Sequence, residues 1–372
     1  MAKKGKKRAC DFTLLLSALL LVFIGIIMVF SASWPEAMRS FDDGYFFLKK
    51  QIVVAGIGFA AMLFFMNFDY KLLRKTSGLI YILSLLSGLL IFTPLGIDRK
   101  GARRWVDLKF ATFMPSDIIK LGAIIFMAAF LSNKKNKPDS LLRGTLPILA
   151  IIGVSCGMIY LQKDLGTTVA LAATLISLFF IAGMKVSHLF AMTVIAGLGL
   201  VKAITSEEYK YRMRRLTAFR DPFADKLDTG WQTVQSLYAL GSGGLFGLGL
   251  GKSRQKFFYI SESYNDFIFA IIGEELGFLG ALIVILLFIV LIWRGIRIAL
   301  SVEDLFGCLL ATGIVAMITV QSLIHIAVVT SSIPTTGIPL PLVSYGGTSL
   351  IIYMSAVGIL LNISRHVKLN RS

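Results

Sequence analysis

Long apolar runs separated by short polar segments make up most of the 372-residue sequence. A run of about 20 apolar residues is long enough to cross the hydrocarbon core of a bilayer as a helix. The pattern predicts an all-α, polytopic membrane protein with about ten transmembrane helices. The expected spans are residues 12–33, 50–67, 78–95, 116–133, 144–162, 167–183, 187–205, 266–293, 303–330 and 345–364.

One long segment, residues 206–265, separates the seventh and eighth expected spans. It mixes aromatic residues, an apolar helical stretch and many glycines, so we expect a compact extracellular loop packed on the membrane surface. The sequence has no linker, low-complexity tract or obvious internal repeat, and we treat residues 1–372 as a single membrane domain. The absence of an inverted repeat makes a secondary transporter a poor fit.

Composition and charge define the setting. Hydrophobic residues make up 56% of the chain, which excludes a soluble core. The basic start, MAKKGKKR, precedes an apolar run too long for a cleavable signal, so the first span is expected to be an anchor. Lysine and arginine occur in every segment on the side of the two termini, which places both termini in the cytoplasm.

Cysteine and histidine give no sign of a disulfide or a metal site. The chain has three of each, at dispersed positions without paired spacing. Zinc chemistry is therefore not expected.

The expected outer face is unusually basic, although outer loops normally carry few cations. Positive residues in the short loop 96–115 are Arg99, Lys100, Arg103, Arg104 and Lys109, and Lys252, Arg254 and Lys256 follow in the large loop. Guanidinium and ammonium groups bind phosphate oxygens, so these loops suggest an anionic ligand. The alternative is a solvated surface that faces lipid headgroups.

Three carboxylates begin the span at 266–293: Asp266, Glu274 and Glu275. Asp266 stands where the large loop meets the span, so its carboxylate is expected to be partly desolvated and still within reach of an external substrate. The alternative role is a helix N-cap. Glu274 lies about 12 Å further along and roughly 80° round the helix. We expect Glu274 and Glu275 to hold neighbouring helices through buried hydrogen bonds.

Further polar residues lie close to other spans. Asp117 and Lys120 are spaced to share one face of the fourth span, as a buried ion pair or as part of a site lining. Asp164 precedes the sixth span, where capping is favoured over a role in the site. The proline-rich segment before the last span is expected to be irregular, as a scaffold or beside a lipid entry groove. The GLGLGKS sequence is not a nucleotide loop, because Phe246 stands where a phosphate loop needs glycine.

Five motifs together carry a family resemblance. They are GARRW at 101–105, QKDLGT at 162–167, GLGLGKSRQKFFY at 247–259, DFIFAIIGEELGF at 266–278 and TGIPLPLVSYGGTSL at 336–350. In order and spacing they resemble the SEDS family of shape, elongation, division and sporulation proteins, over nearly the whole chain. SRQKFFY and the opening LVFIGIIMVFSAS are more similar to the FtsW and SpoVE branch than to the RodA branch.

The resemblance implies a peptidoglycan glycosyltransferase that polymerises lipid II at the outer face of the cytoplasmic membrane, during cell division or sporulation. It implies a class B penicillin-binding protein and other divisome or sporulation proteins as partners, and no nucleic acid. Asp266 matches the family's essential catalytic aspartate. The expected substrate-binding residues are Arg103, Arg104, Asp117, Lys120, Lys252, Arg254 and Lys256. No cofactor is certain, and a divalent cation, Mg or Mn, stays open as an aid to the leaving pyrophosphate.

The chain departs from the family pattern at several positions. Asp117 stands where glutamate is usual, Lys163 where proline is common, and Asn265 where threonine is usual. His325 and Ser331 occupy positions that are more often asparagine and glycine. None of these removes an expected catalytic group. Two other function classes stay open, a lipid II flippase and a non-catalytic division scaffold, and formation of glycan polymer from lipid II distinguishes them.

Overall fold

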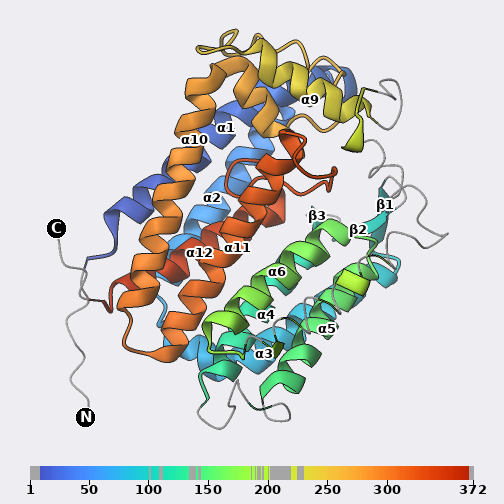
Figure 1. Cartoon of the computed structure of the whole chain (residues 1–372). Coiled ribbons are helices and arrows are strands. Elements are labelled where there is room, and N and C mark those ends of the chain that lie inside the picture. The colour runs from blue at the N-terminus through green and yellow to red at the C-terminus, as the bar shows by residue number, and fades with distance from the viewer. Residues whose placement is uncertain are drawn as a thin grey trace.

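The structure is a computed structural model, and it shows a mostly helical bundle (Figure 1). The residues that the structure describes are 9–99, 102–108, 112–133, 140, 144–185, 187, 188, 190, 194, 197–199, 201, 219–223 and 230–367. The expected cations Lys100 and Lys109, and most of the expected span 187–205, lie outside the described residues.

The helices follow the predicted apolar runs. They are α1 (Phe12–Phe41), α2 (Phe46–Asn67), α3 (Tyr70–Leu89), the short 3-10 helix η1 (Leu90–Phe92), α4 (Pro115–Leu131), α5 (Leu146–Tyr160), α6 (Leu165–Ile181), α9 (Trp231–Ser242), α10 (Ile268–Ser301), α11 (Leu305–Val329) and α12 (Gly347–Ser364). Among the described residues, six segments are long and apolar enough to cross a membrane: α1, α2, α3 with η1, α10, α11 and α12. Helices α5 and α6 are apolar but shorter. The chain is therefore a multi-pass membrane protein, and the count of about ten spans stays a prediction.

The packing has a buried centre and an exposed apolar rim. In the apolar windows of α2 and α3 only 28% of residues are buried, whereas 72% are buried in α12. Helices α11 and α12 therefore form the centre, and the exposed leucines and phenylalanines of α2 and α3 suit contact with lipid. Helix α2 packs along α12, α3 along α4, and α10 between α1 and α11.

A small sheet departs from the all-α expectation. Strands β1 (Gly96–Arg99), β2 (Ala102–Asp107) and β3 (Thr112–Phe113) form an antiparallel sheet in the order β1-β2-β3. Its sequence lacks the regular apolar and polar alternation that predicts a half-buried strand, so the pattern missed it. The backbone N–H of Met114, just after β3, donates to Thr348 Oγ1 (3.0 Å), which ties the sheet to the start of α12.

The two ends of the described chain meet at one end of the bundle. The N–H of Asp11 donates to Ser364 Oγ (3.1 Å), and Nε of Arg294 donates to Asp11 Oδ2 (2.9 Å). Figure 1 shows α9 at the opposite end. This agrees with the expectation that both termini lie on one side, while the side itself stays a prediction.

The segment that joins α11 to α12 is irregular and packed in protein, as expected from its prolines. We call residues 335–346 the strap. Ile338, Leu340, Leu342 and Val343 are almost fully buried. The N–H of Leu340 donates to Ser344 Oγ (2.8 Å), and the N–H of Ser344 donates to the Leu340 carbonyl (3.0 Å). These bonds satisfy backbone groups that a helix would otherwise pair.

Candidate active site

Asp266 lies two residues before α10 and faces the strap. The N-cap residue of α10 is Phe267, which makes no side-chain capping bond, so Asp266 does not occupy the expected N-cap position. The Asp266 side chain is half-buried. A Cβ built on Gly337 of the strap would lie 3.3 Å from Asp266 Oδ2, and Gly337 has a φ of +72°. A side chain at position 337 would therefore be strained and would crowd the carboxylate.

The backbone just before Asp266 is fixed from two directions. Ser263 Oγ donates to the Ala32 carbonyl of α1 (3.1 Å). The N–H of Tyr345 donates to the Tyr264 carbonyl (3.0 Å), and Ser344 Oγ donates to the Asn265 carbonyl (2.7 Å). Three consecutive residues are thus held by α1 and by the strap, which fixes where the Asp266 side chain begins.

The ring of Tyr264, two residues before Asp266, packs in an aromatic cluster. It packs against Phe47 (4.8 Å between ring centroids) and Tyr345 (5.6 Å). Burial raises the pKa of Tyr264, and the charges of Glu262, Glu36 and Asp266 raise it further. Tyr264 is therefore a neutral aromatic wall beside Asp266.

Asp164 and Arg104 meet at the turn between α5 and α6. Oδ1 of Asp164 accepts from the Thr167 N–H (3.1 Å), which confirms its capping role. Arg104 Nη2 donates to the Lys163 carbonyl (2.7 Å), and its Nη1 lies 3.9 Å from Asp164 Oδ1. A Cβ on Gly166 would lie 2.9 Å from the carbonyl oxygen of Thr336 in the strap, so this turn abuts the strap one residue from Gly337.

Arg103 and Arg104 lie on opposite faces of β2. They are neighbours in β2, and successive side chains in a strand point to opposite faces. Arg104 faces the α5–α6 turn, whereas Arg103 is exposed and pairs across the sheet with Asp98 in the β1–β2 register. Of these two arginines, only Arg103 is exposed.

A buried polar cluster joins α4, α11 and α12. Lys120 Nζ lies 2.8 Å from Asp117 Oδ1 and donates to Gln321 Oε1 (2.9 Å), which also accepts from the Tyr353 hydroxyl. Gln321 Nε2 donates to the Pro339 carbonyl of the strap (3.0 Å). The expected ion pair is present, and it is connected to the segment that faces Asp266.

His325 supports the strap one residue earlier. It is fully buried on α11, and its Nδ1 lies 2.8 Å from the Ile338 carbonyl. His325, at a position that is more often asparagine, therefore contacts a backbone carbonyl of the strap.

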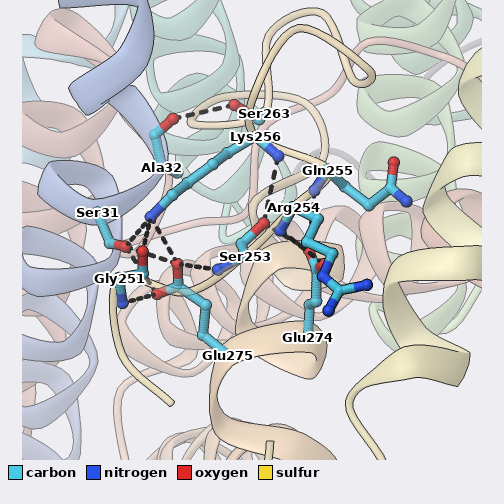
Figure 2. A network of polar contacts seen from close by, with 10 residues as sticks. All are labelled: Ser31, Ala32, Gly251, Ser253, Arg254, Gln255, Lys256, Ser263, Glu274 and Glu275. Atoms are coloured by element: carbon cyan, nitrogen blue, oxygen red, sulfur yellow. Dashed lines mark hydrogen bonds and ion pairs between the residues drawn. The ribbon is translucent and has the colours of Figure 1, made fainter. Parts of the chain in front are cut away.

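Lys256 occupies a buried position that the expected role in substrate binding did not anticipate (Figure 2). Its side chain is 4% exposed, and its Nζ lies 2.9 Å from Glu275 Oε1. The same Nζ donates to the Gly251 carbonyl (2.8 Å) and to Ser31 Oγ of α1 (3.1 Å). All three ammonium donors thus have protein partners, which argues against contact with a ligand phosphate.

The GLGLGKSRQ segment cradles carboxylates of its own chain. The N–H groups of Gly251 and Ser253 donate to Glu275 (3.0 and 3.2 Å), and the N–H of Arg254 donates to Glu274 Oε1 (2.9 Å). Successive backbone N–H groups of this kind form anion-binding nests. Here the nest binds Glu274 and Glu275, and Ser31 of α1 also donates to Glu275 (2.7 Å). Of the three carboxylates, Asp266 thus faces the strap, whereas Glu274 and Glu275 hold the loop.

The remaining expected cations are accessible. Lys252 and Arg254 are exposed beside this nest. Within the described residues, no group of three or more histidine, cysteine, aspartate or glutamate side chains is placed to hold a metal ion.

Sequence reasoning missed Ser31, Gln321 and Ser344. Each is a short or neutral polar residue within an apolar or proline-rich context, and each acts through a contact distant in sequence. Only the tertiary structure brings their partners together.

Comparison with known proteins places the chain in a family. The model of the FtsW, RodA and SpoVE family, described as cell cycle proteins, matches residues 11–369. The chain belongs to this family. Stage V sporulation protein E of Bacillus subtilis (strain 168) is 46% identical over 362 residues, covering 97% of this chain and 98% of the relative. The probable peptidoglycan glycosyltransferase FtsW of Geobacter sp. (strain M18) is 40% identical over 359 residues, covering 96% and 97%.

Solved structures show the same fold. A chain of a peptidoglycan synthase complex that coordinates polymerization and crosslinking matches with a TM-score of 0.77 and 24% identity, over 96% of this chain and 98% of the other. The rod shape determining protein RodA of Thermus thermophilus matches with a TM-score of 0.70 and 23% identity, over 97% and 99%.

Proposed function

We propose that this protein is a peptidoglycan glycosyltransferase that polymerises lipid II into glycan strands at the outer face of the cytoplasmic membrane. Family membership supports the activity, because FtsW relatives that align over nearly the whole chain are named as probable peptidoglycan glycosyltransferases. The observation that carries the proposal is the half-buried Asp266, fixed before α10 and facing Gly337.

Asp266 acts as the general base. It takes the proton from the 4-hydroxyl of the acceptor sugar, and the oxygen then attacks the anomeric carbon of the lipid-linked donor. The bond from that carbon to the pyrophosphate oxygen breaks, and lipid pyrophosphate leaves with the electron pair. A half-buried carboxylate suits this task because it is partly desolvated and still accessible to a sugar.

Exposed cations take up the charge that develops on the leaving group. Arg103, Lys252 and Arg254 are the outward-facing candidates, and Arg104 contributes while it holds the α5–α6 turn. Lys256 is not one of these cations, because its buried ammonium group pairs with Glu275 and stabilises the fold. Asp117 and Lys120 act from inside the bundle, by holding the strap through Gln321.

The partner is a class B penicillin-binding protein that crosslinks the new strands. The structural match to a chain of a peptidoglycan synthase complex supports such a pairing. The cellular role is cell division or sporulation, supported by the similarity to FtsW and to stage V sporulation protein E. Both termini are cytoplasmic in this arrangement, and divisome or sporulation proteins assemble with the pair.

Purified protein with its penicillin-binding partner tests the function. We expect glycan strands on a denaturing gel when lipid II is supplied in proteoliposomes. A flippase would move lipid II across the bilayer without polymer, and a scaffold would do neither. Transport without polymer, under conditions where a related polymerase works, would overturn the proposal.

A further inference from the structure

The loop between α9 and Lys252 exposes large apolar side chains. We call residues 243–251 the glycine loop. Phe246 is 78% exposed, Leu245 64% and Leu250 55%. Burial of a leucine or phenylalanine side chain is favourable, so three such side chains left in water would forgo that stabilisation. An exposed apolar patch of this kind indicates an apolar partner.

The backbone of this loop is joined to α10 by an exchange of hydrogen bonds. Gly277 has a φ of 69° and a ψ of −169°, which interrupts the helix. The N–H groups of Phe278 and Leu279 would otherwise donate to the carbonyls of Glu274 and Glu275.

Instead, the N–H groups of Phe278 and Leu279 donate to the loop carbonyls of Gly244 (2.9 Å) and Leu245 (3.2 Å). The carbonyls of Glu274 and Glu275 accept from the loop N–H groups of Leu248 and Gly249, each at 3.0 Å. The loop thus replaces the two helical bonds that the kink at Gly277 breaks.

Glycine is required for this approach. A Cβ on Gly247 would lie 2.2 Å from the Glu275 carbonyl oxygen, and a Cβ on Gly243 would lie 1.9 Å from the Gly273 carbonyl oxygen. Irregular backbone is tolerated at membrane depth only where its polar groups are satisfied by protein. The exchange with α10 provides this for the loop groups named above.

The helix fixes the depth of the loop. Trp293, which is half-exposed, and the adjacent Arg294 and Arg297 mark the membrane interface at the far end of α10. Phe278 precedes Trp293 by 15 residues. At 1.5 Å per residue this is about 22 Å, less than the roughly 30 Å of the hydrocarbon core. The carbonyl of Leu245 accepts from Leu279, the residue after Phe278, so Leu245 lies within the apolar layer.

The exposed surface of α10 continues onto the loop. Phe278 is 59% exposed and Leu279 43%, both on a helix apolar enough to cross the membrane. The loop is bonded to α10 at these two residues, and its Leu245 and Phe246 side chains are exposed as well. The patch is thus continuous with a lipid-facing surface.

We propose that the glycine loop is a re-entrant segment inserted into the leaflet at the Asp266 end of the membrane, where Leu245 and Phe246 contact lipid acyl chains. Leu250, which precedes Gly251 and its bond to the Glu275 carboxylate, lies at the edge of that layer. The polar nest around Glu274 and Glu275 then marks the boundary with water. This inference is independent of the catalytic role of Asp266.

Depth measurement with spin labels tests the insertion. Phe246→Cys, Leu279→Cys and Lys252→Cys are made singly in a variant whose Cys10, Cys156 and Cys308 are serine, and each is labelled in nanodiscs without any partner protein. Collision rates with oxygen, which concentrates in lipid, are compared with those of a water-soluble nickel chelate. We expect the oxygen-to-nickel ratio at 246 to match that at 279 and to exceed that at 252 several-fold.

Two results would overturn the proposal. A ratio at 246 equal to that at 252 would place the loop in water, and protection from both reagents would mean that protein covers it. A second variant, Phe246→Trp in the chain with its native cysteines, covers the case in which the serine variant fails to fold. Lipids brominated on the acyl chain should quench its added fluorescence relative to the parent, and unchanged quenching contradicts insertion.

Discussion

Nζ of Lys256 lies 2.9 Å from Oε1 of Glu275, and both side chains are almost fully buried. The pair links the loop that precedes Asp266 to α10, and Ser31 extends the link to α1. The basic pattern of the loop predicts that Lys256 binds substrate phosphate. In the structure Lys256 instead connects the loop to α10 and α1. Lys256 and the exposed Arg254 can be separated by experiment.

Lys256→Met is expected to destabilise the fold strongly. It leaves the Glu275 carboxylate buried without its cation, a loss of about 3–5 kcal/mol in comparable cases. Lys256→Met with Glu275→Gln removes both charges and should recover part of the loss. Thermal unfolding in nanodiscs measures both, with the exposed Arg254→Met as control. Equal melting temperatures for Lys256→Met and Arg254→Met would refute a structural role for this pair.

Arg103→Ala is expected to lower lipid II turnover and leave thermal stability unchanged, because Arg103 is exposed. The difference between Arg103→Ala and the wild type should shrink at high salt. Ions then screen the attraction between Arg103 and the anionic substrate in the wild type, so that its removal matters less. Arg104→Ala should lower stability too, because Arg104 holds the Lys163 carbonyl. The measurement is the initial polymerisation rate across a salt series. Wild-type rates for Arg103→Ala at low salt would leave this cation without a ligand.

Ser344→Ala is expected to slow polymerisation with little change in the KM for lipid II. The hydroxyl of Ser344 bridges the Leu340 N–H and the Asn265 carbonyl, so its loss frees the residue before Asp266 to shift. A small misplacement of a catalytic group costs up to about 100-fold in rate. Ser355→Ala, which loses only a bond to its own helix at Ile351, is the control.

The loss should disappear in an Asp266→Asn background, because Ser344 acts through Asp266. An undiminished additional loss there, or wild-type rates for Ser344→Ala, would count against a positioning role.

Apolar run length predicted the helices well, as for α11, expected at 303–330 and found at Leu305–Val329. It also placed Asp266 at the junction of loop and span. The partners of these residues were beyond reach, because Lys256 and Glu275 are 19 residues apart across irregular backbone, and Ser31 is 244 residues from Glu275. The nest around Glu274 depends on backbone N–H groups, which no sequence pattern marks as donors.

The most direct test concerns Asp266 itself. Asp266→Asn keeps the shape of the side chain but cannot accept the proton of the sugar hydroxyl. General-base catalysis contributes roughly 10² to 10⁴-fold, so single-turnover polymerisation of lipid II should fall by about that factor. Glu262→Gln, a nearby half-buried carboxylate, should stay close to wild type at matched thermal stability and partner binding. A near-normal rate for Asp266→Asn would contradict the assignment of Asp266 as the base.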